Sequence, residues 1–224
     1  MRKWLVSGSQ LHYICPMTSH QMRYILLWKP YGVLSQFTPE GSYKGLSSLG
    51  PFPPDVYAVG RLDAESEGLL LLTNDNRIKN FLADPKTGHP RTYLVQVERM
   101  PSEESLEQLR RGVLIEGKKT RPAEVRLLDR EPTLPPRPVP IRYRKNVSTA
   151  WLEIVLREGR NRQIRKMTAA VGHPTLRLVR TAIGTLTMRG LKPGQWRELN
   201  ETEIAALRGG QVGGWLQSHP PDGS

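Results

Sequence analysis

The chain has 224 residues, with 33 Lys and Arg against 21 Asp and Glu, which gives a formal net charge of +12 at pH 7. This length supports one sizeable domain with a buried core, and the charge favours a polyanionic partner, nucleic acid before a membrane. The single cysteine, Cys15, excludes an intramolecular disulfide, the five scattered histidines argue against a metal site, and no apolar run approaches the roughly 20 residues of a membrane span. We therefore expect a cytoplasmic protein that binds neither a metal nor a membrane.

The first half of the chain mixes predicted strands and helices. Residues 1–21 are polar and irregular, and we expect them to form a flexible arm. Short buried strands are predicted at residues 23–28 and 56–59, and the alternating RTYLVQVE predicts another at 91–98. A helix should begin after Ser102, because Leu106 and Leu109 fall on one face and the first turn is acidic.

The second half continues this mixture. Five prolines at residues 132–140 require an extended connection, and WLEIVLRE alternates as a strand from Trp151. Ile164, Met167 and Val171 recur at helical spacing before Gly172, which suits a helix end. The tail at 209–224 is rich in glycine and proline and is predicted to be disordered. This irregular alternation of elements favours an α+β fold over a doubly wound sheet.

The segment GRLDAESEGLLLLTND, residues 60–75, places Asp63 just ahead of four leucines. One interpretation is structural: Asp63 caps a helix that begins at Ala64, with early glutamates that suit the helix dipole. The alternative is a nucleophilic or basic carboxylate beside an apolar wall, Leu69 to Leu72. Such a carboxylate would become protonated unless an arginine from elsewhere in the chain kept it ionised.

A strongly basic stretch offers such arginines. Residues 157–180 contain seven basic residues and one acid, so their local charge of +6 is half of the net charge. Arg162, Arg165 and Lys166 are expected to share one face of the predicted helix. A solvated basic surface is one interpretation. Binding of phosphates or a carboxylate is the other, and it is favoured because arginine dominates over lysine here.

Five segments in order resemble the signature of the pseudouridine synthases of the family that comprises the small-subunit synthase A and the large-subunit synthases B, E and F. They are KPYGVLSQFT (29–38), GRLDAESEGLLLLTND (60–75), RTYLVQV (91–97), EGRNRQIRKM (158–167) and LRLVRTAIG (176–184). The resemblance spans about residues 23–200. It departs from the family at Asn76, where glycine is usual, and asparagine tolerates the same left-handed turn.

The resemblance implies the fold of that family. This is a central mixed, mostly antiparallel sheet flanked by helices, with an RNA-binding cleft. The catalytic domain would occupy residues 22–208 in two lobes. Many relatives also carry a small N-terminal RNA-binding domain, and the first motif here begins too early to leave room for one. That feature is similar to the E branch, which implies one uridine in large-subunit (23S) ribosomal RNA as the substrate.

The resemblance also implies a role for each matching residue. Asp63 matches the essential aspartate that acts on the target uridine, and Arg165 matches the arginine that pairs with it. Tyr93 matches the aromatic residue that stacks on the uracil, and Ile164 would pack near the base. Arg61 resembles the arginine that enters the space left by the flipped nucleotide, because the reacting carbons are unreachable inside a base stack.

Further basic residues, Lys29, Arg160, Arg162 and Lys166, are expected to contact RNA, although Lys29 could instead brace the fold. The isomerisation involves no redox change and no phosphoryl transfer, so the resemblance implies no cofactor, and we expect a monomer. The sequence leaves open whether Asp63 attacks C6 of the base, attacks C1′ or removes the C2′ proton.

Two other classes of protein share some of these features. A retaining glycosidase would use carboxylates such as Glu65, Glu67 and Asp75, but it needs two carboxyl groups about 5 to 5.5 Å apart, and helical spacing does not bring Glu65 beside Asp63. A non-catalytic RNA-binding module would explain the positive net charge, but it would assign no role to Asp63 and Arg165. An assay of mass-neutral uridine isomerisation discriminates between these classes.

Overall fold

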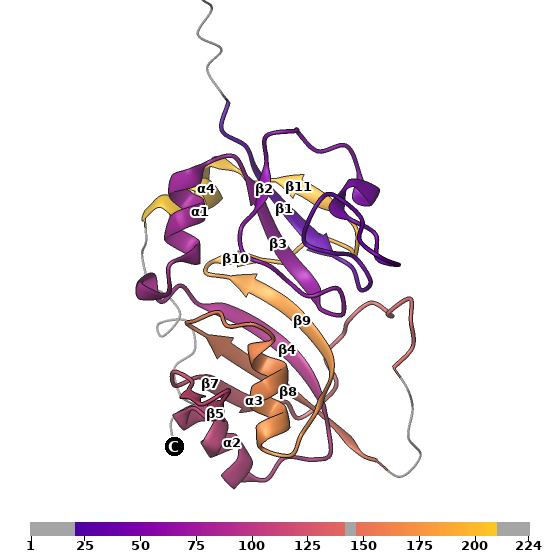
Figure 1. The fold of residues 1–224 in the computed structure, drawn as a ribbon, viewed down its shortest axis with the longest axis vertical. Helices are drawn as coiled ribbons and strands as arrows, with labels where there is room; N and C mark the ends of the chain where they lie inside the picture. Colours follow the sequence, from indigo (N-terminus) through magenta and orange to yellow (C-terminus); the bar gives the residue numbers. More distant parts are fainter. Residues whose placement is uncertain (1–20, 142–146, 210–224) are drawn as a thin grey trace, which may run out of the picture.

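The computed structural model describes residues 21–141 and 147–209 (Figure 1). The predicted N-terminal arm and C-terminal tail therefore lie outside the described residues, apart from positions 21 and 209. The strands are β1 (Tyr24–Lys29), β2 (Tyr57–Ala58), β3 (Glu67–Thr73), β4 (Arg91–Glu98), β5 (Leu114–Ile115), β6 (Lys118–Lys119), β7 (Glu124–Leu127), β8 (Thr149–Leu156), β9 (Thr175–Ile183), β10 (Leu186–Thr187) and β11 (Trp196–Glu198). The α-helices are α1 (Asn76–Ala83), α2 (Glu103–Arg111), α3 (Gln163–Ala170) and α4 (Glu201–Gly209), with 3₁₀ turns at Leu46–Leu49 and Pro85–Thr87.

One mixed sheet runs through both halves of the molecule, in the order β11-β1-β3-β9-β4-β8-β7, with β2 paired to β3 and β10 to β9. All of these pairs are antiparallel except β3 with β9. Helices α1 and α4 lie against the upper half in Figure 1, and α2 and α3 lie against the lower half. The predicted α+β fold with a mixed, mostly antiparallel sheet is confirmed.

The four leucines of residues 69–72 belong to a strand, so the helix considered to begin at Ala64 is wrong. Every residue of β3 is buried, because both faces of β1 and β3 are covered. Helices α1 and α4 pack on one face, and the loops from Val33 to Val56 pack on the other. A strand that is buried on both faces shows a continuous apolar run in place of alternation.

The two halves join where β3 runs parallel to β9. The pairing is short, Glu67 with Val179 and Gly68 with Arg180. Gly68 has φ +107°, and a Cβ at this position would lie 2.2 Å from the carbonyl oxygen of Arg180. Only glycine allows the two backbones to approach this closely. This close approach of the two backbones at Gly68 lies five residues after Asp63 in the sequence.

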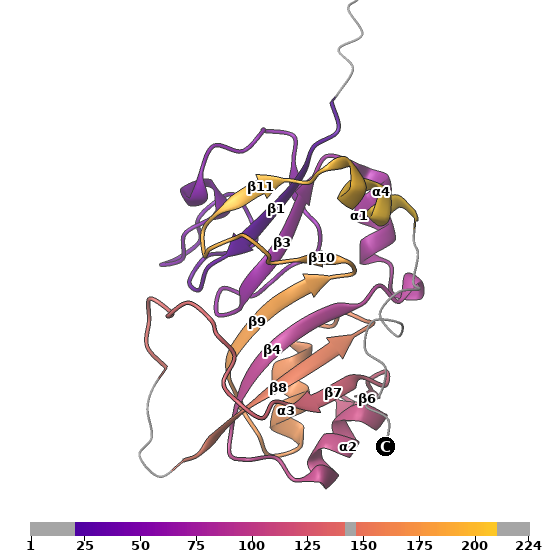
Figure 2. The ribbon, with the colours of Figure 1, turned by 180° about the vertical axis from the view of Figure 1, so that it is seen from behind.

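The lower half follows the predicted pattern closely. Strand β4 spans the predicted residues 91–98, and Ser102 caps α2 by accepting a hydrogen bond from the backbone N–H of Ser105. Helix α3 ends before Gly172, which has φ +87°. Helices α2 and α3 bury their apolar residues against β4, β7, β8 and β9 in one cluster. The proline-rich connection after β7 leaves the sheet as an irregular loop, as Figure 2 shows from behind.

Candidate active site

Hydrogen bonds from the segment KPYGVLSQFT hold the loop that carries Asp63. Buried Ser35 makes a reciprocal pair with Leu62: its Oγ accepts from the Leu62 N–H at 2.9 Å and donates to the Leu62 carbonyl at 2.8 Å. On the other side of Asp63, the N–H of Gly32 donates to the carbonyl of Ala64 at 2.8 Å. The backbone is therefore fixed on both sides of the carboxylate, which limits the positions that the side chain can reach.

Lys29 lies beneath the same loop and is fully buried. Its Nζ donates to the carbonyls of Val33 at 2.5 Å, Pro30 at 3.1 Å and Ala64 at 3.5 Å. Burial lowers the pKa of Lys29 to about 7, and the nearby carboxylate of Glu67 opposes this change. Of the two roles expected for Lys29, bracing the fold agrees with this position, whereas a contact with an RNA phosphate does not.

The guanidinium nearest to Asp63 belongs to Arg162. Its Nη1 lies 3.6 Å from Oδ2 of Asp63, and its Nη2 donates to Oε2 of Glu65 at 3.2 Å. Arg162 precedes α3 and adopts left-handed backbone angles, φ 50° and ψ 33°. It therefore does not share a helix face with Arg165 and Lys166, and the sequence prediction on this point is wrong. Non-glycine residues in this conformation are concentrated at functional sites.

Arg165 takes a neighbouring position without an ion pair to Asp63. Its Nη2 donates to the carbonyl of Glu65 at 2.9 Å and its Nη1 to the carbonyl of Thr175 at 3.4 Å. Its Nε is buried and has no hydrogen-bond partner among the described residues. Burial lowers the pKa of Arg165, while the carboxylates of Glu65 and Asp63 oppose this effect. In this state of the protein Arg162, and not Arg165, is within ion-pair distance of Asp63.

Tyr93 and Ile164 lie beside the aspartate loop in the lower core cluster, together with Leu62. Tyr93 is on β4, at a register shift of its pairing with β9, and its phenol lies near the guanidinium of Arg180. Arg180 is 3% exposed and donates from Nε to the carbonyl of Leu69 at 2.7 Å. Burial lowers the pKa of Arg180, and the nearby phenol of Tyr93 opposes that change. The phenol of Tyr93 thus lies beside a buried cation, whose Nη2 has no hydrogen-bond partner among the described residues.

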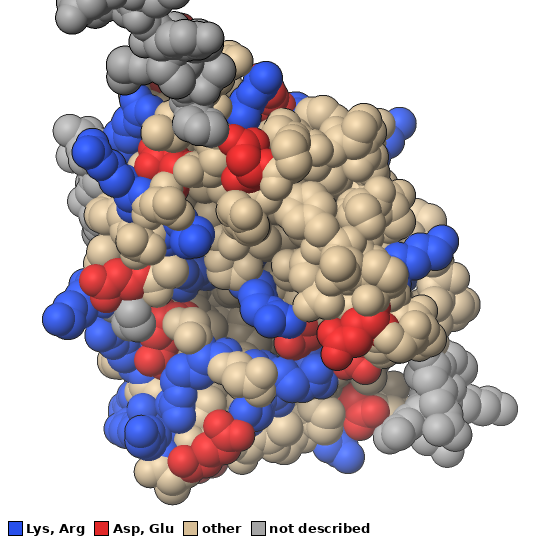
Figure 3. All heavy atoms as spheres, turned by 45° about the horizontal axis from the view of Figure 1, so that its top comes forward, with Lys and Arg blue, Asp and Glu red and all other residues tan. Residues whose placement is uncertain are grey.

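The remaining residues predicted to contact RNA differ in the bonds that their side chains make to other described residues. Arg61 is exposed, and no side-chain bond to another described residue is found for it. Arg160 donates to two carbonyls of the β5–β6 hairpin, at 3.1 and 3.2 Å, and Lys166 forms an ion pair with Glu116 at 2.6 Å. Lys and Arg side chains gather below a hollow on the face seen in Figure 3. Of these three residues, Arg61 has the freest side chain for binding RNA.

Several residues that support the site were not predicted from the sequence. Ser35 lies within the segment KPYGVLSQFT, but nothing in the sequence indicates its hydrogen bonds to Leu62. Glu67 and Arg177 form a buried bidentate ion pair, with both bonds at 2.9 Å, and Arg177 also donates to the carbonyl of Pro135 at 2.8 Å. A glutamate and an arginine 110 positions apart cannot be paired from a single sequence, because only the β3–β9 contact brings them together.

Among the described residues, no group of three or more His, Cys, Asp or Glu side chains could hold a metal ion. Nor does any helix in ranges 21–141 and 147–209 have the length and apolar character needed to span a membrane. Asp63 and Glu65 both contact the guanidinium of Arg162, although helical spacing was expected to separate these two carboxylates. Spacing therefore does not exclude a glycosidase, and the assignment depends on comparison with known proteins.

Residues 23–170 match the family of RNA pseudouridylate synthases. A protein of Xanthomonas campestris named ribosomal large subunit pseudouridine synthase E is 55% identical over 175 residues, covering 77% of this chain and 93% of the relative. A Vibrio parahaemolyticus protein of the same name is 48% identical, covering 82% and 77%. A Bacillus subtilis protein named ribosomal large subunit pseudouridine synthase B is 37% identical, covering 83% and 71%.

A solved structure described as a pseudouridylate synthase superposes with a TM-score of 0.70 at 26% identity, covering 84% of this chain and 74% of that one. The fold, the five segments and these relatives agree with one another, and the predicted resemblance is confirmed. The chain belongs to the RNA pseudouridylate synthase family and is an RNA-modifying isomerase.

Proposed function

We propose that this enzyme converts one uridine of large-subunit ribosomal RNA (23S) to pseudouridine, and that Asp63 carries the chemistry. The proposal rests on one observation above all: a half-exposed carboxylate, with 32% of its side chain accessible, lies against Arg162 at the join of the two halves. Each chemistry considered for Asp63 requires a carboxylate that the substrate can reach and whose position is fixed. The names of the relatives support the RNA substrate.

The other site residues receive roles from their positions. Tyr93, which lies beside Arg180, would stack on the uracil, and Ile164 would pack next to it. The target must leave the base stack to reach Asp63, and exposed Arg61 would fill the space that it leaves. Arg165 would pair with Asp63 once RNA binds, which requires it to leave the carbonyl of Glu65.

The hollow below which Lys and Arg gather in Figure 3 is the proposed RNA cleft between two lobes of the catalytic domain, residues 22–208. The reaction rearranges one nucleotide without a change in mass or oxidation state. We therefore propose that a cytoplasmic monomer performs it without a metal or cofactor. Undiminished activity in a chelating buffer and a monomeric mass in solution are the expected results.

Substitution of Asp63 by asparagine tests the central assignment. Asp63→Asn keeps the shape and one oxygen acceptor but removes the charge, so pseudouridine formation should disappear while RNA affinity and melting temperature persist. Exposed Asp129→Asn is the matched control and should remain active. Pseudouridine mapping of ribosomal RNA from cells with and without the gene should show the loss of one site. An Asp63→Asn enzyme that still isomerises uridine would refute the proposal.

A further inference from the structure

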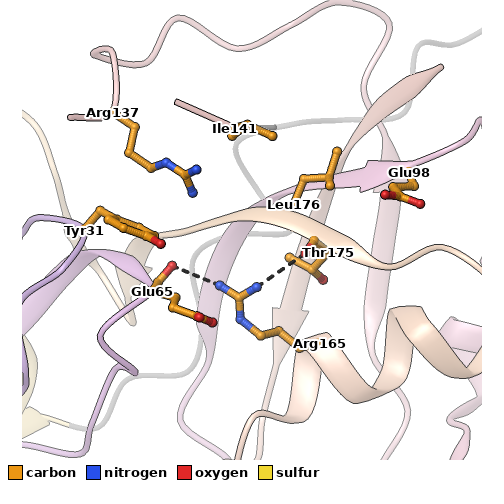
Figure 4. Close-up of a pocket in the computed structure, with 8 residues that line it drawn as sticks. All are labelled: Tyr31, Glu65, Glu98, Arg137, Ile141, Arg165, Thr175 and Leu176. Atoms are coloured by element: carbon orange, nitrogen blue, oxygen red, sulfur yellow. Dashed lines mark hydrogen bonds between the residues drawn. The ribbon is translucent and has the colours of Figure 1, made fainter. Parts of the chain in front are cut away.

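A pocket of about 230 Å³ lies beside the Asp63 loop, between the two halves of the molecule and the proline-rich loop (Figure 4). It is lined by Tyr31, Glu65, Glu98, Arg137, Ile141, Arg165, Thr175 and Leu176. The pocket is partly open to solvent, so a planar base can enter it. The pocket shares a wall with the proposed active site, because Arg162 contacts both Asp63 and Glu65.

Two guanidinium groups in this pocket lack a carboxylate partner. Arg165 donates to main-chain carbonyls, and the Nε of Arg137 donates to the carbonyl of Val139 at 2.5 Å. For neither group is a carboxylate oxygen of a described residue found within 4 Å, and the carboxylate of Glu65 is held by Arg162. Glu65 and Glu98 also line the pocket, and the carboxylate of Glu65 is held by Arg162, so the guanidinium of Arg137 is the cation that can bind an anion there.

The pocket also contains an aromatic face. The guanidinium carbon of Arg137 lies 4.3 Å from the centroid of the Tyr31 ring, so a planar cation covers that face. In Figure 4, Arg137 reaches down from the proline-rich loop toward Tyr31, and Arg165 enters from α3 on the other side. Arg177 holds the loop two residues earlier, through the carbonyl of Pro135. Arg137 can thus leave the ring while its backbone stays near.

We propose that this pocket binds the unpaired nucleotide adjacent to the target uridine, with its base stacked on Tyr31 and its phosphate bound by Arg137. An aromatic face beside a guanidinium that has no carboxylate partner among the described residues matches the base and the phosphate of a nucleotide. Replacement of Arg137 by a base on the Tyr31 ring is favourable, because stacking of a base on an aromatic ring is worth more than an exposed cation–π contact. This inference rests on the proposed function, since it concerns the same RNA.

Steady-state kinetics on a large-subunit ribosomal RNA transcript provide the first test. Tyr31→Ala should raise KM by about 5- to 100-fold with kcat nearly unchanged, and Tyr31→Phe, which keeps the ring, should restore the wild-type KM. Arg137→Ala should raise KM and reduce the salt dependence of binding by about one phosphate contact. Matched controls are Tyr57→Ala and Arg130→Ala, an exposed tyrosine and an exposed arginine outside the pocket, and neither should change KM.

The second test remains informative even where Tyr31→Ala fails to fold, because Tyr31→Leu keeps apolar volume without the ring. Once mapping has located the target, RNA oligonucleotides with an abasic residue on either side of it are compared. The wild-type enzyme should bind one of them about 5-fold or more weakly than the intact RNA, and the Tyr31 variant should not distinguish the two. Equal losses for both proteins, or a KM within two-fold of wild type in Tyr31→Ala and Arg137→Ala, would overturn the subsite. A wild-type enzyme that forms no pseudouridine would instead refute the proposed function.

Discussion

Replacement of Lys29 by methionine should change how the stability of the protein depends on pH. The pKa of Lys29 falls from the ordinary lysine value of 10.5 to about 7 in the folded state, chiefly through burial. Between these values the unfolded chain binds more protons than the folded one, so the free energy of unfolding should rise with pH. The slope approaches about 1.4 kcal/mol per pH unit, and the gain from pH 7 to pH 9 is about 2 kcal/mol.

The sign of this pH dependence follows from which protonation state of Lys29 the folded protein disfavours. The folded state disfavours the Lys29 ammonium, so the destabilisation is complete below pH 7 and disappears above pH 10.5. Urea unfolding at pH 7, 8 and 9 should show a gain for the wild type that Lys29→Met lacks. Exposed Lys44→Met is the matched control and should keep the wild-type profile. Parallel profiles for wild type and Lys29→Met would show that the three carbonyls and Glu67 hold the proton against burial, contrary to this reasoning.

Three further predictions concern packing and RNA binding. Gly68→Ala should lower the free energy of unfolding by at least about 3 kcal/mol in urea, because its Cβ would meet the backbone of Arg180; Gly60→Ala, with open space around it, should cost less. Arg177→Met should cost about 3–5 kcal/mol by leaving the Glu67 carboxylate buried alone, and combining it with Glu67→Gln should recover part of that loss in the same assay. The logarithm of RNA affinity should fall with the logarithm of salt concentration, by about 0.7 to 0.9 for each phosphate contact, and a flat titration would contradict phosphate-driven binding.

Sequence patterns predicted the strands and helices that bury one face and expose the other. Strand β4 alternates, and α2 has a capping serine and an apolar stripe, so each can be identified locally. The run at Leu69 to Leu72 could not be assigned in this way, because a continuous apolar segment fits a buried helix as well as a buried strand. Its conformation depends on the loops and helices that cover both faces of β3, which lie far away in the sequence.

The contacts within the candidate site could likewise be predicted only in part from the sequence. Residue types and motifs identified the aspartate loop and the basic segment, but not which arginine approaches Asp63. That choice depends on the left-handed backbone of Arg162, which turns its side chain toward the carboxylate while Arg165 binds carbonyls. Lys29 was expected at the RNA surface as one of two alternatives. Lysine is seldom fully buried, so its three carbonyl partners could not be anticipated from composition.

The position of Asp63 makes its environment depend on both halves of the protein. The upper half fixes its backbone through Ser35 and Lys29, whereas its nearest cation, Arg162, comes from the lower half. The only direct strand pairing between these halves in the described sheet is the short β3–β9 contact at Gly68, supported by the Glu67–Arg177 ion pair. A small shift at this contact would alter the 3.6 Å separation of Asp63 and Arg162. Substitutions at the contact that leave the protein folded should therefore impair catalysis more than RNA binding, because phosphate contacts tolerate displacement better than an oriented carboxylate does.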